Sequence, residues 1–134
     1  MPGLFSSTSH NTAKVLLDQT ISDGTPVALL PFECLGYSLL GFQLAWYGNL
    51  VGVWSKIGIS NSYVIDPGSA LFTQLTDATD SLVAFMTGTG AGVVNGTPNS
   101  AYVEWATAAG AIGLEFTRTA GSGRLWVVAT GKGS

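Results

Sequence analysis

Apolar side chains alternate with small or polar ones along residues 37–47, and this two-residue period is the feature that most constrains the fold. One side of an extended chain would carry Ser38, Leu40, Phe42, Leu44 and Trp46. Successive side chains of a β-strand point to opposite faces of its sheet, so this spacing predicts a strand. We expect the face with Phe42 and Trp46 to lie in a core.

Two tight hairpins are predicted from the connections between alternating segments. Gly48-Asn49 separates residues 37–47 from a second alternating segment, residues 50–60. A two-residue connection that tolerates positive φ is typical of a hairpin, so these strands are expected to pair. Near the C-terminus, residues 120–123 would join a second pair of strands in the same way, which the sequence places at residues 112–117 and 125–130.

The rest of the chain predicts an all-β fold. Eighteen glycines and short alternating segments favour an antiparallel β-sandwich, jelly-roll or Ig-like, with eight or nine strands and little helix. Glycine-rich residues 87–100 are expected to form an exposed loop. We expect one sandwich domain over residues 14–132, preceded by a flexible N-terminal arm over residues 1–13. Weaker strands are predicted at residues 15–19, 26–32, 71–75, 82–86 and 101–106.

The low charge of the chain indicates a surface that other subunits cover. Charged residues make up 10% of the sequence, against about 25% in ordinary soluble domains. Aromatic residues are enriched at the centres of interfaces. In the predicted strands, Trp54 and Trp126 lie opposite the most continuous apolar faces, so we expect them to contact another subunit or a ligand. Tyr47 and Tyr63 complete the set of candidate interface residues.

Several classes of protein are disfavoured by the same sequence. The uncharged stretch between Glu33 and Lys56 could span a bilayer by its length, but repeated glycines and the alternating pattern argue against a membrane helix. The N-terminus lacks the basic start and apolar block of a signal peptide, so synthesis in the cytoplasm is expected. With a net charge of −3 and five basic residues, the chain offers no positive electrostatic field that would bind the phosphates of a nucleic acid.

No catalytic motif is found in the sequence. His10 is the only histidine and lies in a polar N-terminal stretch, where a catalytic base would be poorly held. Cys34 is the only cysteine, which excludes an internal disulfide, and its neighbours indicate a buried, inert thiol. Glu104 and Glu115 are interpreted as outward-facing strand carboxylates or as partners of arginines, rather than as a catalytic pair. We therefore expect no enzyme activity, no metal and no cofactor.

Asp77 and Asp80 could serve either of two roles. Together with neighbouring threonines they could hold Ca²⁺ loosely through oxygen atoms, since calcium takes six to eight such ligands. Asp and Thr also favour turns through their own local hydrogen bonds. Turn formation is the favoured interpretation.

A further set of segments combines strand ends with glycine-containing turns: Gly36-Tyr37-Ser38 with Gln43, residues 47–52, Ser60-Asn61, residues 116–123 and Gly131-Lys132. With these segments, the predicted strands and turns resemble small β-sandwich virion proteins of tailed bacteriophages. The likeness runs through most of residues 15–132, and no residue role follows from it. It implies a decoration, cement or fibre-anchoring component of the particle.

These arguments lead to one functional hypothesis and two alternatives. We expect a non-enzymatic structural protein of a phage particle, made in the host cytoplasm, that decorates or cements the major capsid lattice. Its partners would be further copies of itself and other virion proteins. The alternatives are a tail or head-fibre component, and a carbohydrate-binding β-sandwich module that stacks sugars on Trp54, Trp126 or tyrosine side chains.

Overall fold

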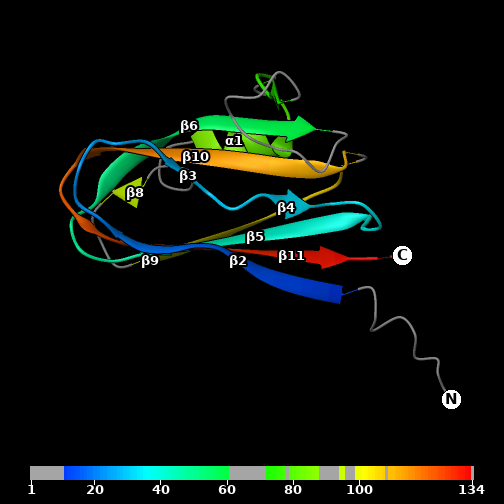
Figure 1. Ribbon diagram of the computed structural model, residues 1–134, viewed down its shortest axis with the longest axis horizontal. Coiled ribbons are helices and arrows are strands. Elements are labelled where there is room, and N and C mark those ends of the chain that lie inside the picture. The colour runs from blue at the N-terminus through cyan, green and yellow to red at the C-terminus, as the bar shows by residue number, and fades with distance from the viewer. Residues whose placement is uncertain are drawn as a thin grey trace, which may run out of the picture.

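The protein is a sandwich of two antiparallel β-sheets that face each other, as the sequence predicts (Figure 1). The computed structural model describes residues 11–60, 72–77, 79–87, 94–95, 99–107 and 109–133. The first sheet has the strand order β2 (Asn11–Ile21), β11 (Gly123–Lys132), β5 (Leu39–Trp46) and β9 (Asn99–Trp105). We call it the β11 sheet.

The second sheet, called the β10 sheet, is built on two long central strands. These are β10 (Ala111–Ala120) and β6 (Val51–Ser60), which pair along most of their length. Short strands flank them on both sides. Beside β10 lie β3 (Val27–Ala28) and β4 (Phe32–Glu33), and beside β6 lie β7 (Thr73–Gln74) and β8 (Val94–Asn95).

Both predicted hairpins are wrong, because each connection crosses from one sheet to the other. β5 pairs with β11 and β9, whereas β6 pairs with β10. β10 and β11 likewise belong to different sheets. The alternation correctly indicated the buried faces of β5, β10 and β11, but it carries no information about which strand lies beside each of them.

The two crossing turns lie together at one end of the sandwich, on the left in Figure 1. Gly48 has φ of 79° and Gly121 has φ of 65°, a backbone region that favours glycine. The amide of Tyr47 donates to the carbonyl of Arg124 at 3.0 Å. The glycines predicted as hairpin residues therefore do form turns, but the turns pair with each other.

A β-bulge in β6 changes which side chains face the core. Lys56 pairs with Glu115 and Trp54 pairs with Phe116, so Ser55 is an extra residue in the ladder. The bulge lets Trp54 and Ile57, three positions apart, both point inward. The prediction that Trp54 lies on the face opposite Ile57 is wrong for this reason.

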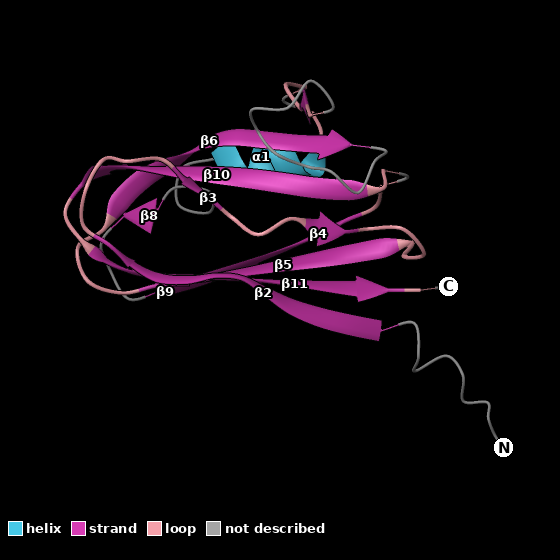
Figure 2. Ribbon diagram, in the orientation of Figure 1, coloured by secondary structure: helices cyan, strands magenta, loops and turns pink. Residues whose placement is uncertain are grey.

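Residues 82–86, predicted as a strand, form the middle of helix α1 (Ser81–Thr87). The Oδ1 atom of Asp80 accepts hydrogen bonds from the amides of Leu82 and Val83 at 2.9 and 3.2 Å, which is how an N-cap residue begins a helix. Leu82, Val83 and Met86 are buried, with a spacing that suits one face of a helix. The helix contacts β9 and β6 and lies behind the β10 sheet in the view of Figure 2.

Apart from residues 82–86, the weaker strand predictions are confirmed in position but not in length. The first strand begins at Asn11, so the last three residues of the predicted arm pair with the end of β11. Residues 26–32 divide into β3 and β4, and the segment between them touches both sheets. In that segment the amide of Leu29 donates to Leu114 in β10, and that of Leu30 donates to Leu16 in β2. Most of the predicted loop, residues 87–100, and the arm before Asn11 lie outside the described residues, although β8 falls within that loop.

The core lies between the sheets and includes the face of β5 that the sequence marks as buried. Phe42 and Trp46 are fully buried, as predicted. Trp54 meets Phe116 edge to face, with ring centroids 5.2 Å apart. No helix in the described ranges is long and apolar enough to cross a membrane.

Candidate interaction surface

The outer face of the β11 sheet gathers side chains from all four of its strands. Leu125, Val127 and Ala129 point into the core, so the alternate residues of β11 point outward. Residues paired across a ladder share a face, and the register therefore fixes two neighbouring rows on this surface. One row is Asp18, Trp126, Ala45 and Ser100, and the next is Val15, Val128, Gln43 and Tyr102.

Two of the predicted interface residues meet at one end of this face. Tyr47 and Trp126 lie edge to face, with ring centroids 5.9 Å apart. The guanidinium of Arg124 lies over the Trp126 ring, 4.3 Å from its centroid. We call Asp18, Tyr47, Arg124 and Trp126 the Trp126 cluster.

A two-pronged ion pair holds the arginine of this cluster in place. Arg124 donates from Nε to Asp18 Oδ1 at 2.7 Å and from a terminal nitrogen to Oδ2 at 3.0 Å. The hydrogen bond from Arg124 is the main cause that lowers the pKa of Asp18 below its usual range, and Asp18 in turn raises the pKa of Arg124. Both side chains are substantially exposed, so the pair adds little to folding stability. The pair instead fixes the position of the arginine, because it holds the guanidinium of Arg124 over the Trp126 ring.

The cluster adjoins exposed apolar side chains in the next row. Val15, in that row, is 50% exposed, and Tyr47, within the cluster, is 45% exposed. Val128, paired with Val15, is half-buried. The cluster and these neighbours therefore form a patch with an apolar and aromatic centre and a paired, neutral set of charges at its edge, which is the usual anatomy of a protein interface.

The other two interface predictions have different outcomes. Trp54 is only 6% exposed and belongs to the core, so its prediction as an interface residue is wrong. Tyr63 lies outside the described residues. Trp54 is buried and Arg124 covers one face of the Trp126 ring, so at most one face of the two indoles is open to a stacked sugar.

This surface also contains Asp18, Val15 and Arg124, which were not predicted from the sequence. Arg124 and Trp126 are two positions apart in one strand, so their shared face could have been found from the sequence. Asp18 and Val15 come from a distant strand, and a bulge between Val127 and Val128 shifts their register. Only the three-dimensional pairing brings them beside Trp126.

The two carboxylates considered as a catalytic pair lie in different sheets. Glu104 is exposed on β9 and accepts a hydrogen bond from the Tyr102 hydroxyl at 3.1 Å. Glu115 is half-buried on β10 and accepts one from Ser55 Oγ at 2.7 Å. Their interpretation as strand carboxylates is confirmed, and they do not converge on a substrate.

The acidic residues near α1 form turn and cap structures, as the favoured interpretation predicts. Asp77 Oδ1 accepts from the amide and the hydroxyl of Thr79 at 2.9 and 2.7 Å. These bonds lower the pKa of Asp77. Asp80 caps α1 and also accepts from the indole of Trp105 at 3.1 Å. Within the described part of the chain, no group of three or more acidic, histidine or cysteine side chains could hold a metal ion, and His10 lies outside that part.

Cys34 is a buried thiol, as predicted. Its Sγ atom lies 3.4 Å from the carbonyl of Phe32. Burial raises the pKa of Cys34 to about 12, so the side chain stays a protonated thiol at neutral pH and is a poor nucleophile.

Comparison with known proteins does not assign this surface. The chain matches no protein family with a known sequence pattern, and it matches no curated protein.

Proposed function

We propose that this protein is a non-enzymatic structural protein of a bacteriophage particle, and specifically a decoration or cement protein of the capsid. It attaches to the lattice of the major capsid protein through the Trp126 cluster and the adjoining Val15 and Val128. The observation that carries the proposal is this apolar and aromatic centre, edged by an internally paired Arg124 and Asp18, on a broad outer sheet face.

The composition supports a surface that is covered in the assembled state. Only 10% of the residues are charged. Tyr, Trp and Arg are the residues most enriched where interface contacts are strongest, and all three meet in the Trp126 cluster. Because Arg124 and Asp18 already neutralise each other, covering them requires no new partner of opposite charge.

Repetition would make such a contact durable. Apolar burial contributes about 25 cal/mol per Å², and loss of rotational and translational freedom offsets much of that in a single small contact. A subunit that also contacts its own copies on a lattice is held at several points at once, so its attachment strengthens without new chemistry.

Immunogold electron microscopy tests the location directly. An antibody raised against the purified chain would be applied to particles released by cells that carry its gene. Regular labelling over the capsid surface supports the proposal. Labelling confined to the tail or fibres, or no labelled particle at all, overturns the assignment as a decoration protein.

A pair of variants tests the surface. Trp126→Ser removes the centre of the cluster, whereas Val53→Ser removes an exposed apolar side chain from β6, in the other sheet. Particles assembled in the presence of each variant would be purified, and the amount of bound chain measured. We expect loss of binding for Trp126→Ser alone; equal retention of both variants would contradict the proposed face.

A further inference from the structure

A separate hollow lies farther along the outer face of the β11 sheet, above Gly41. It has a volume of about 220 Å³. β5, β9 and β11 each contribute to it, and the side chains that carry its chemistry are Tyr102, Glu104, Thr130 and Lys132.

The glycine at position 41 makes room for the Tyr102 side chain that forms one side of the hollow. Gly41 pairs with Thr130 on one side and with Glu104 on the other, so the three share one row of the outer face. A Cβ atom at position 41 would lie 2.5 Å from the Tyr102 hydroxyl and 2.7 Å from Thr130 Oγ1. Tyr102 therefore lies across the space that a side chain would fill, and its ring is a wall of the hollow.

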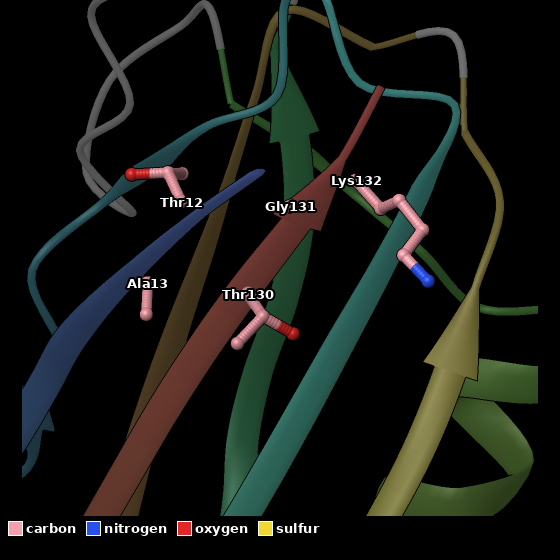
Figure 3. Close-up of a pocket in the computed structure, with 5 residues that line it drawn as sticks. All are labelled: Thr12, Ala13, Thr130, Gly131 and Lys132. Atoms are coloured by element: carbon pink, nitrogen blue, oxygen red, sulfur yellow. The ribbon is translucent and has the colours of Figure 1, made fainter. Parts of the chain in front are cut away.

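Both hydrogen-bond donors and hydrogen-bond acceptors surround the Tyr102 ring. The hydroxyl of Tyr102 donates to Glu104 Oε2 at 3.1 Å. Burial, and then Glu104, raise the pKa of Tyr102, which keeps its hydroxyl protonated. The side chain of Lys132 extends from β11 across β5 toward β9, and Thr130 lies between β11 and β5 (Figure 3).

The charges around the hollow select against ions. Glu104 disfavours an anion such as phosphate, and Lys132 disfavours a cation. A neutral ligand with many hydroxyl groups can satisfy both charged side chains. Its hydroxyls donate to Glu104 and Thr130 and accept from Lys132. The ring of Tyr102, 55% exposed, offers an aromatic surface to the C–H face of such a ligand.

The volume of the hollow fits one sugar ring. At about 30 Å³ per water molecule in the liquid, the hollow has room for roughly seven waters, comparable to one sugar ring. A second hollow of about 400 Å³ begins on the other side of Thr130 and extends toward Ala13 in β2 (Figure 3). A longer saccharide could continue in that direction.

We propose that the hollow above Gly41 binds one neutral pyranose unit, with Tyr102 as its aromatic wall, Glu104 and Thr130 as acceptors and Lys132 as donor. This site goes beyond the proposed structural role and does not depend on it. Thr130 lies four residues along β11 from Trp126 and two from Val128, about 13 Å and about 7 Å in an extended strand, so the sugar at Gly41 lies beside the proposed attachment surface and not on it.

Titration of the isolated chain tests the proposal. Amide spectra of the full ¹⁵N-labelled chain would be followed with glucose, galactose, mannose and N-acetylglucosamine, and with neutral polymers of the same sugars. We expect at least one of them to shift the signals of Gly41, Tyr102 and Thr130 in a saturable way. Binding of the polymer alone would identify a chain-internal unit as the ligand, and binding of the monosaccharide a single free or terminal residue.

Matched variants separate a site from a general effect. Glu104→Gln and Lys132→Met replace exposed side chains without loss of core packing, and each should weaken the binding about tenfold, the weight of one hydrogen bond to a charged group. Asp18→Asn, on the same face but in the Trp126 cluster, should leave it unchanged. The proposal is overturned if no sugar shifts these signals, if both variants bind normally, or if inorganic phosphate or free lysine binds there instead.

Discussion

Asn49 and Ser122 join the two turns through which the chain crosses between its sheets. The amide of Ser122 donates to Asn49 Oδ1 at 2.9 Å, and the amide of Asn49 donates to the Ser122 carbonyl at 3.1 Å. Gly121 packs so closely here that a Cβ atom would overlap the carbonyl oxygen of Asn49. Each crossing turn therefore supports the other, and both depend on glycine.

Gly121→Ala should destabilise the protein by at least about 2 kcal/mol, because it adds both a strained positive φ and an overlap with backbone. Gly36→Ala isolates the strain, since Gly36 has φ of 92° but open space around it. Gly24→Ala has neither effect, because its nearest atom would be 3.9 Å away. Urea unfolding of the three variants should give that order of stability loss; an equal loss for Gly121→Ala and Gly36→Ala would show that the contact between the turns is unimportant.

The crossing turns also show where prediction from sequence ends. The alternation in residues 37–47 correctly placed Phe42 and Trp46 in the core, and the glycines correctly marked turns. A turn within a sheet and a turn between two sheets use the same residues, however, because both need a short chain reversal. The choice between them is made by distant contacts, such as that of Tyr47 with Arg124, which no local pattern contains.

The absence of long-range contacts from local sequence patterns also limited the prediction of the candidate surface. Trp126 was found because β11 alternates regularly. Trp54 was misplaced because a single extra residue, Ser55, reverses the faces of the strand before it. Helix α1 was missed because seven residues provide less than two full turns of apolar periodicity, and its capping by Asp80 was interpreted as a loop turn.

Truncation of Trp54 should reduce folding stability much more than truncation of Trp126. Trp54→Ala removes a buried ring that packs on Phe116, and we expect a loss of about 3–5 kcal/mol. Trp126→Ala removes a half-buried ring on the outer face, and its cost should remain below about 1.5 kcal/mol. Urea denaturation measures both losses, and similar values would contradict the burial of Trp54 in the core.

Asp80 should be the most sensitive of the acidic residues near α1. Asp80→Ala removes the N-cap of the helix and the acceptor of the Trp105 indole, so we expect a loss of about 2 kcal/mol. Asp80→Asn keeps an acceptor for the cap and should lose less. Asp77→Ala, which only opens a surface turn with Thr79, is the control. Thermal or urea unfolding should rank the three; an Asp77→Ala variant as unstable as Asp80→Ala would contradict this account.

The pairing of Asp18 with Arg124 predicts a pH dependence below about pH 4. The folded state lowers the pKa of Asp18 relative to the unfolded chain, whose value is about 3.9. The contribution of this group to stability is therefore present above the unfolded pKa and is lost as the pH falls through the folded one. Wild type and Asp18→Asn should differ in urea midpoint at pH 6 and converge toward pH 2. High salt should shrink the difference at pH 6, because the pair is exposed; a gap that persists at pH 2 would assign the effect to something other than charge.

Cys34 predicts a second pH effect, at the alkaline end. Its pKa is about 12 in the folded protein, and about 8.5 in an unfolded chain. Below pH 8 both states hold the proton, so the group does not alter stability there. Above that pH the unfolded state releases its proton first, and stability should fall as the pH rises. Cys34→Ala should remove this part of the alkaline decline, which unfolding curves at pH 7 to 10 would measure.

In the native protein at pH 8, a disulfide reagent should label Cys34 only as fast as the structure opens, and at the free-thiol rate in denaturant. Labelling of the native protein at the free-thiol rate would contradict the burial of this side chain in the core.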